Sequence, residues 1–164
     1  MDPETTSSDM STVKANPKDL EAMRPLITET VPWLKDSGLR VEIFDIGHVK
    51  LSVPAARHLN HVGLVWAATQ FMLMEVSGAA LFAATYGIDR FVPVNKGMSI
   101  RFLKPAMTDI TCELSLTSEE AELRLASVVE RGKGDWVLDM SVTDANGTVV
   151  SSSSCNYYII PRPA

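Results

Sequence analysis

The chain has 164 residues, of which 46% are hydrophobic and 21% are charged. These values are typical of one globular domain with a substantial core, and they exclude a globally disordered chain. The formal net charge of -5 argues against a nucleic-acid partner, because phosphate binding requires a positively charged surface.

The cysteine and histidine patterns do not indicate a metal or disulfide site. Cys112 and Cys155 lie in alternating, strand-like sequence without a CxxC motif or a Cys/His cluster. We therefore expect two buried free thiols. His58 and His61 lack a third ligand nearby in the sequence, so no metal site is predicted.

The N-terminal residues 1–16 carry no hydrophobic periodicity and are predicted to be a disordered tail, followed by a single domain over residues 17–164. No basic segment followed by an apolar one marks a signal peptide, which favours a cytoplasmic protein. Asn16 is a plausible helix N-cap, and Pro25 and Pro32 should divide the segment that follows into short helical pieces.

A strand and a long helix are expected next. Residues 39–54 alternate between apolar and polar side chains, which predicts a strand with a bend or bulge at Gly47. From about His61 to Tyr86 the chain is apolar on every side, which predicts one long buried helix ending before Gly87. Its length would span a membrane. Polar residues interrupt it and no basic cluster flanks it, so we expect a core helix with no membrane insertion.

Five further segments each show the two-residue periodicity of a half-buried strand. They cover residues 91–105, 109–119, 121–132, 135–145 and 147–160. Their connections are short, so neighbouring strands should run antiparallel, and Asn146–Gly147 is typical of a type I′ hairpin turn. The predicted fold is α+β, with a curved antiparallel sheet wrapped around the long central helix and a second subunit covering the rest of that helix.

This order of elements, with several motifs, resembles the hot-dog fold thioesterase superfamily, and within it the PaaI-like acyl-CoA thioesterases and their uncharacterised relatives. In that family an N-x-x-G-x-x-H-G-G segment opens the central helix, and an acidic residue follows fifteen positions after the Asn. Asn60, Gly63 and Glu75 match this pattern, and "RFLKPAMTD" and "DANGTVV" match two later elements. Trp66, Ala67 and Ala68 stand where the family has His-Gly-Gly.

The resemblance implies hydrolysis of a thioester, with four catalytic candidates. Ala67 stands at the position of the family's oxyanion donor, and it keeps the backbone N–H that this role requires. Glu75 would act as general base or nucleophile on a thioester held by the partner subunit, and its apolar neighbours should raise its pKa. Asn60 would orient the thioester or a water, and Gly63 would let the substrate approach the backbone. The structural alternatives are a buried, hydrogen-bonded Glu75 and a helix-capping Asn60.

The substrate-binding candidates are His61 and Trp66 beside the helix start, and Arg101 and Lys104 in the most basic stretch of the chain, which suits CoA phosphates. The expected partner is an acyl-CoA or acyl-carrier thioester, and CoA enters as part of the substrate, with no other cofactor. The resemblance implies a homodimer or a dimer of dimers. A non-catalytic acyl-thioester or fatty-acyl binding protein is the alternative function, and a hydratase or dehydratase of the same fold is a weaker third.

Overall fold

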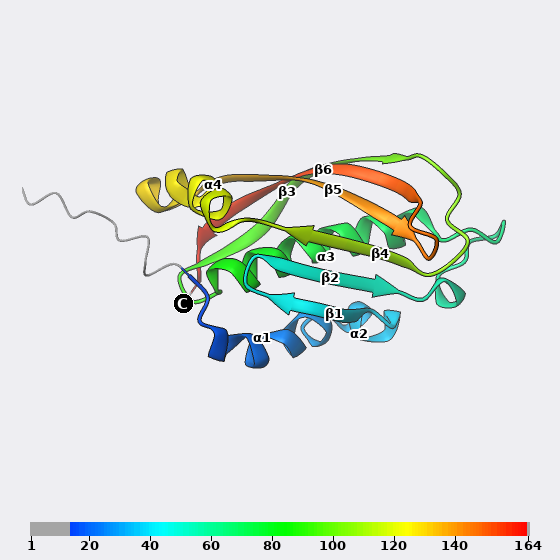
Figure 1. Cartoon of the computed structure of the whole chain (residues 1–164), viewed down its shortest axis with the longest axis horizontal. Coiled ribbons are helices and arrows are strands. Elements are labelled where there is room, and N and C mark those ends of the chain that lie inside the picture. The colour runs from blue at the N-terminus through cyan, green and yellow to red at the C-terminus, as the bar shows by residue number, and fades with distance from the viewer. Residues whose placement is uncertain (1–13, 164) are drawn as a thin grey trace, which may run out of the picture.

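The computed structural model describes residues 14–163 and places five helices and six strands in them (Figure 1). The helices are α1 (Pro17–Glu29), α2 (Pro32–Ser37), the 3-10 helix η2 (Ala55–Arg57), α3 (Ala67–Tyr86) and α4 (Ser118–Arg131). The strands are β1 (Arg40–Asp45), β2 (His48–Val53), β3 (Phe91–Phe102), β4 (Ile110–Ser115), β5 (Gly134–Asp144) and β6 (Val149–Pro161). Most of the predicted disordered tail, residues 1–13, lies outside the described residues. Within the remainder of that tail, Ala15 is buried and donates its N–H to the Thr85 carbonyl.

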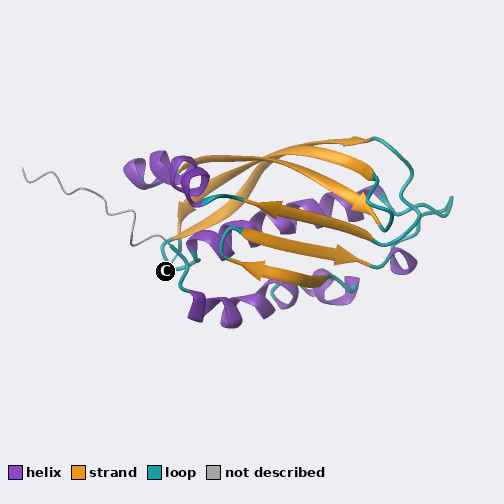
Figure 2. Ribbon diagram, in the orientation of Figure 1, coloured by secondary structure: helices purple, strands orange, loops and turns teal. Residues whose placement is uncertain are grey.

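The six strands form one antiparallel sheet in the order β1-β2-β4-β5-β6-β3. β3 follows α3 directly in the sequence, yet it lies at the edge of the sheet opposite β1. The chain therefore crosses the whole sheet through α3, which lies along one face of it (Figure 2). This architecture confirms the predicted hot-dog fold, in which a curved antiparallel sheet wraps a long central helix.

α3 is buried along most of its length, because apolar side chains occur all around it. Within the described residues it is the one helix long and apolar enough to cross a membrane, with a mean hydropathy of 1.3, but 72% of that span is buried inside the domain. The prediction of a core helix ending before Gly87 is confirmed. Its predicted start is wrong: α3 begins at Ala67, because residues 59–65 form a tight hairpin ahead of it.

The segment 121–132, predicted as a strand, belongs to the helix α4 instead. The Thr117 hydroxyl accepts the Glu120 N–H, and the Glu120 carboxylate accepts the Thr117 N–H, so a capping box starts the helix. Leu123, which the alternation placed beside Leu125 on the inner face, is 71% exposed. The side chains that are buried have helical spacing: Ala121, Leu125, Val128 and Val129.

Two local predictions near the N-terminus also change. Pro25 lies inside α1 without ending it, although an interior proline removes a backbone donor and crowds the preceding turn. Gly47 lies in the turn between β1 and β2, with φ at 73°, and the bulge lies between Val41 and Ile43. The predicted N-cap is confirmed, since the Asn16 side chain accepts the Lys18 N–H.

The turn between β5 and β6 is not type I′. That turn needs a positive φ at both Asn146 and Gly147, and only Gly147 has one. The Asp144 carboxylate instead accepts the N–H groups of Asn146 and Thr148 and holds the turn. The prediction of two free thiols is confirmed, since Cys112 and Cys155 are both buried and unpaired.

Candidate functional site

The start of α3 presents backbone donors that nothing in the described chain accepts. Trp66 is the N-cap residue and makes no side-chain cap. The N–H groups of Val65 and Trp66 donate to the carbonyls of Ala106 and His58, each at 2.8 Å, which holds the chain as it enters the helix. The next two N–H groups, of Ala67 and Ala68, have no acceptor among the described residues. Because the positive end of the helix dipole lies here, these groups can hold an oxyanion.

Asn60 shapes the hairpin that precedes α3 rather than capping the helix. Its Oδ1 accepts the N–H groups of Val62 at 3.0 Å and Leu64 at 3.1 Å. Gly63 has a φ of 78°, a conformation that suits glycine, and its N–H donates to the Asn60 carbonyl. The alternative in which Asn60 caps the long helix is therefore wrong, since the N-cap residue is Trp66. Its amide nitrogen has no partner in the described chain and is free for a ligand.

Two cavities border this hairpin, and Asn60 lines both of them. The helix-start cavity, of about 360 Å³, is lined by Asn60, Leu64, Val65, Ala67, Gln70, Phe102, Leu103, Lys104, Pro105 and Ala106. The tryptophan cavity, of about 490 Å³, is lined by Trp33, Asp36, Ser37, Arg57, His58, Leu59, Asn60, His61 and Trp66. The first is mainly apolar and contains the free Ala67 donor, whereas the second is aromatic and polar.

Glu75 lies about two turns into α3, on the side of the helix that is least covered. The partly or fully exposed residues of the helix repeat along one stripe: Ala67, Ala68, Phe71, Glu75 and Ala79. Within the described chain the Glu75 carboxylate has no hydrogen-bond or ion-pair partner, and burial raises its pKa above the ordinary 4.5. The Tyr157 hydroxyl donates to the Glu75 backbone carbonyl at 2.6 Å and fixes β6 against this turn of the helix.

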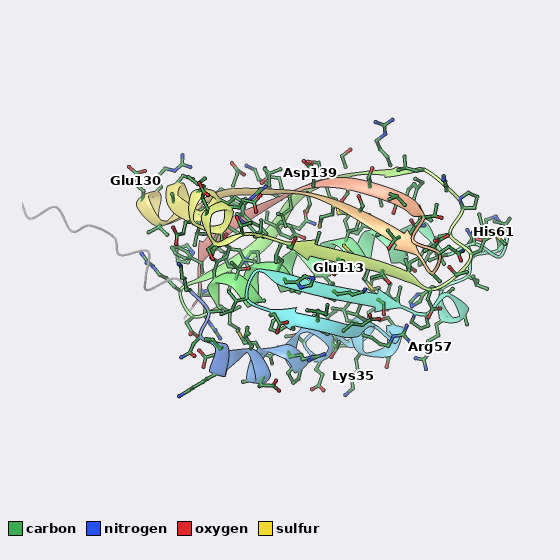
Figure 3. All side chains as sticks on the ribbon, viewed as in Figure 1. Lys35, Arg57, His61, Glu113, Glu130 and Asp139 are labelled. Carbon is green, nitrogen blue, oxygen red and sulfur yellow. The ribbon has the colours of Figure 1, made fainter. Side chains whose placement is uncertain are left out.

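The structure brings some of the predicted site residues together and separates others. Ala67 and Lys104 share the helix-start cavity, while His61 and Trp66 share the tryptophan cavity. Arg101 lines a hollow with Asp139 and residues 152–154 of β6, all serines, on the sheet face turned away from α3. Figure 3 shows His61 at the tip of the hairpin and Asp139 far from it. Within one chain, Arg101 and Glu75 therefore join neither cavity.

Two polar residues that the sequence reasoning did not select hold the helix start in place. His58 contacts the Ser37 carbonyl through Nε2 at 2.8 Å and Thr69 Oγ1 through Nδ1 at 3.1 Å. Because a carbonyl only accepts, Nε2 carries the proton, and Nδ1 accepts from Thr69. Gln70 donates from Nε2 to the Val65 carbonyl, and its buried Oε1 has no partner. For Gln70 the available signal was a polar side chain in an otherwise apolar helix, whereas His58 lies before that helix and carries no such signal.

No group of three or more metal-ligating side chains occurs among residues 14–163. The site is thus a set of backbone donors, one carboxylate and two cavities.

The profile of a family described as "Domain of unknown function (DUF4442)" matches residues 21–159. The chain belongs to the DUF4442 family. A solved structure of a Pseudomonas aeruginosa protein of unknown function, named a probable thioesterase, is 35% identical to this chain with a TM-score of 0.81. The match covers 91% of this chain and 99% of that one.

Two more distant structures share the fold. A Shewanella oneidensis protein named as a proposed thioesterase is 17% identical with a TM-score of 0.71, and the match covers 89% of this chain and 100% of that one. A glutamine-to-alanine variant of a P. aeruginosa thioesterase is 15% identical with a TM-score of 0.70, and the match covers 92% of this chain and 99% of that one. The curated proteins contain no significant match to this DUF4442 chain.

Proposed function

We propose that this DUF4442 protein is a thioesterase that hydrolyses an acyl-CoA to a carboxylic acid and free CoA. The observation that carries the proposal is the start of α3, where Ala67 lines an apolar cavity and the N–H groups of Ala67 and Ala68 have no acceptor in the described chain. Such donors stabilise the oxyanion that forms when a thioester carbonyl is attacked. The names of the solved relatives support the same reaction class.

The second requirement of the reaction is a base for the attacking water, and Glu75 supplies it. Its carboxylate takes a proton from water as the oxygen bonds to the carbonyl carbon, and the negative charge moves to the oxygen held by Ala67 and Ala68. When the C–S bond breaks, the proton returns to the leaving thiolate, so the products are an acid and a thiol. A pKa raised by burial makes the carboxylate a stronger base.

These two parts of the site cannot meet within one chain. Ala67 and Glu75 lie eight residues apart on one helix, which is a rise of about 12 Å, whereas both must lie within about 3 Å of the reacting group. Two copies related by a twofold axis, with their α3 stripes facing, would place Glu75 of one beside Ala67 of the other. The catalytic site we propose is therefore shared in a homodimer.

The free edge of the sheet supports this assembly. β3 is twelve residues long, pairs with β6 on one side, and has no partner on its other side among the described residues. It carries exposed apolar side chains, with Val94 at 48% and Phe102 at 50% exposure, and the α3 stripe exposes Phe71 at 41%. A long edge with apolar side chains is protected when a second copy extends the sheet.

The helix-start cavity suits the acyl group, since Leu64, Val65, Phe102, Leu103 and Pro105 give it apolar walls. The polar side chains at its boundary are those of Lys104, Gln70 and Asn60. Arg101, predicted to bind the substrate, would have to reach it from the other face of the sheet, and we assign it no role in the reaction.

The Ala67→Pro variant tests the oxyanion donor directly. Proline is favoured at the first position of a helix, Trp66 already has the extended backbone that precedes proline, and the Ala67 N–H makes no bond in the described chain that would be lost. The fold should be preserved, while kcat for release of thiol from a panel of short, medium and aryl acyl-CoAs should fall at least about a hundredfold. An active Ala67→Pro enzyme would overturn this role.

Glu75→Gln tests the base in the same assay, with Glu130→Gln as a control of the same chemistry at an exposed position on α4 (Figure 3). We expect Glu75→Gln to lose at least about a hundredfold in kcat and Glu130→Gln to behave as wild type. Equal rates for the two variants would remove Glu75 from the mechanism.

A non-catalytic acyl-thioester binding protein is the second candidate, favoured by the alanine methyl groups at 67 and 68 where the resembling family has glycines. It predicts that acyl-CoA binds by calorimetry while no member of the panel releases thiol. The thioesterase proposal predicts turnover of at least one member.

A further inference from the structure

The tryptophan cavity lies outside the groups that the proposed reaction uses. Two indoles border it, Trp33 from α2 at 51% exposure and Trp66 from the end of the hairpin at 53%. They are far apart in the sequence but lie around one hollow of about 490 Å³, larger than the helix-start cavity. Tryptophan is costly to leave in water, and two in one hollow indicate a flat apolar ligand.

The polar groups of this cavity limit which polar groups the ligand can carry. Ser37 Oγ and both nitrogens of His58 are already used by internal hydrogen bonds. The groups with unused capacity are the Arg57 guanidinium, the His61 ring and the amide nitrogen of Asn60, together with the Asp36 carboxylate. Arg57 spends one nitrogen on the Asp36 backbone carbonyl and keeps the others. Apart from Asp36, the spare groups can all donate.

We propose that the tryptophan cavity binds a nucleotide, with a purine base stacked on Trp33 and Trp66 and phosphate oxygens on Arg57 and His61. Stacking on an indole and forked donation from arginine are the contacts that bases and phosphates prefer. The Asp36 carboxylate can accept from an exocyclic amine of the base. In a chain of net charge -5, this pairing of aromatic faces with arginine is a local feature and not a consequence of overall charge.

This inference rests on the proposed function, because the nucleotide it assigns is the adenosine phosphate end of the CoA substrate. Asn60 lines both cavities, so the two adjoin at the same hairpin. A CoA thioester can therefore place its acyl group in one and its nucleotide in the other, with the pantetheine arm passing the start of α3. Figure 3 shows Arg57 and His61 at this same end of the molecule.

The first test is a titration of the full chain with adenosine 3′,5′-bisphosphate, followed by tryptophan fluorescence. The chain has three tryptophans, and Trp136 is only 1% exposed, so a change in emission reports Trp33 and Trp66. We expect quenching in the wild type, a smaller change in Trp33→Phe and in Trp66→Phe, and none in the double variant. Full quenching in the double variant, or no binding by the wild type, would overturn the inference.

The second test compares Arg57→Gln with Lys35→Gln, which removes the same charge from an exposed residue of α2 that does not line the cavity. Thermal unfolding checks that both variants are folded. Arg57→Gln should weaken binding of the bisphosphate about tenfold, and Lys35→Gln should leave it unchanged. Equal affinities of the two variants would contradict the assignment.

The third test separates this inference from the proposed function, using one acyl group carried by CoA and by N-acetylcysteamine, which lacks the nucleotide. Arg57→Gln should reduce the advantage of the CoA ester in kcat/KM about tenfold. If both esters are hydrolysed and Arg57→Gln leaves the kcat/KM advantage of the CoA ester unchanged, the nucleotide-site proposal is wrong and the thioesterase proposal holds. If neither is hydrolysed while the bisphosphate binds as described, the thioesterase is wrong and the nucleotide site stands.

Discussion

At the scale of single residues, Glu75 connects the proposed chemistry to stability, because burial raises the pKa of its carboxyl above 4.5. Between the unfolded and folded pKa values, the folded state holds a proton that the unfolded state has released. The free energy of unfolding therefore falls as pH rises through that window, and this loss is complete above the folded pKa.

Two results follow for the pH dependence of Glu75. Glu75→Gln, which cannot ionise, should be more stable than the wild type at pH 7, and the difference should vanish below about pH 4. In the active enzyme, kcat/KM should fall on the acid side with an apparent pKa above 4.5. Urea unfolding at several pH values and a pH–rate profile measure these effects. A stability difference that persists at low pH would show that the amide acts through packing rather than through charge.

The two thiols give a residue-scale prediction with practical use in the assay. Cys112 and Cys155 have no exposed surface, and burial raises the pKa of both, that of Cys112 to about 12. The reactive thiolate is thus both rare and inaccessible. We expect neither to react with Ellman's reagent in the native protein and both to react in denaturant, so thiol released from substrate is measured without background. Rapid labelling of the native chain would show that the β4–β6 region opens.

At the scale of elements, the contact between α3 and β6 depends on Gly78. A Cβ built there would lie 2.2 Å from the Tyr157 hydroxyl, which donates to the Glu75 carbonyl and is held by a buried ring. Gly78→Ala should lower the free energy of unfolding by about 1–3 kcal/mol, since the packed neighbours leave no room for a methyl group. The matched control is Gly97→Ala in β3, where nothing lies within 4 Å. If the two variants unfold at the same denaturant concentration, the contact is not tight.

The elements also show how far local pattern predicts structure. The central helix was predicted because it is apolar on every side, and four of the five later segments predicted as strands are strands, because their two-residue periodicity has one interpretation. The strand prediction for segment 121–132 was wrong because its alternation of apolar and charged residues is also compatible with a helix. The capping residues Thr117 and Glu120 were the signal that indicates a helix. The late start of α3 depends on the Asn60 side chain accepting two backbone N–H groups. No periodicity reports such a bond.

The candidate site was predicted less completely than the fold, for a geometric reason. Ala67, Glu75 and Asn60 were identified through the resemblance, but which cavity each side chain enters depends on register and hairpin shape. Arg101 illustrates this, since the irregularity of β3 at residues 95–97 helps fix which side chains face α3. Trp33 was not selected, because its partner Trp66 is 33 positions away and only the folded chain brings them together.

At the scale of the whole molecule, the exposed α3 stripe and the β3 edge, which is unpaired in the described chain, are the surfaces that the proposed dimer would cover. The proposed dimer makes each site from the helix start of one copy and the carboxylate of the other. A shared site has a consequence that a site within one chain does not have: two inactive variants can restore each other, provided that their defects lie in different halves.

Ala67→Pro and Glu75→Gln form such a pair. In a mixed dimer, the Glu75→Gln copy supplies an intact helix start and the Ala67→Pro copy supplies an intact carboxylate, so one site has both parts and the other has neither. Co-expression with two affinity tags isolates the mixed dimer, and light scattering confirms its mass. We expect about half of the wild-type rate per dimer, because one of the two equivalent sites is whole. Mixed dimers as inactive as each parent would place both groups in the same chain and refute the shared site.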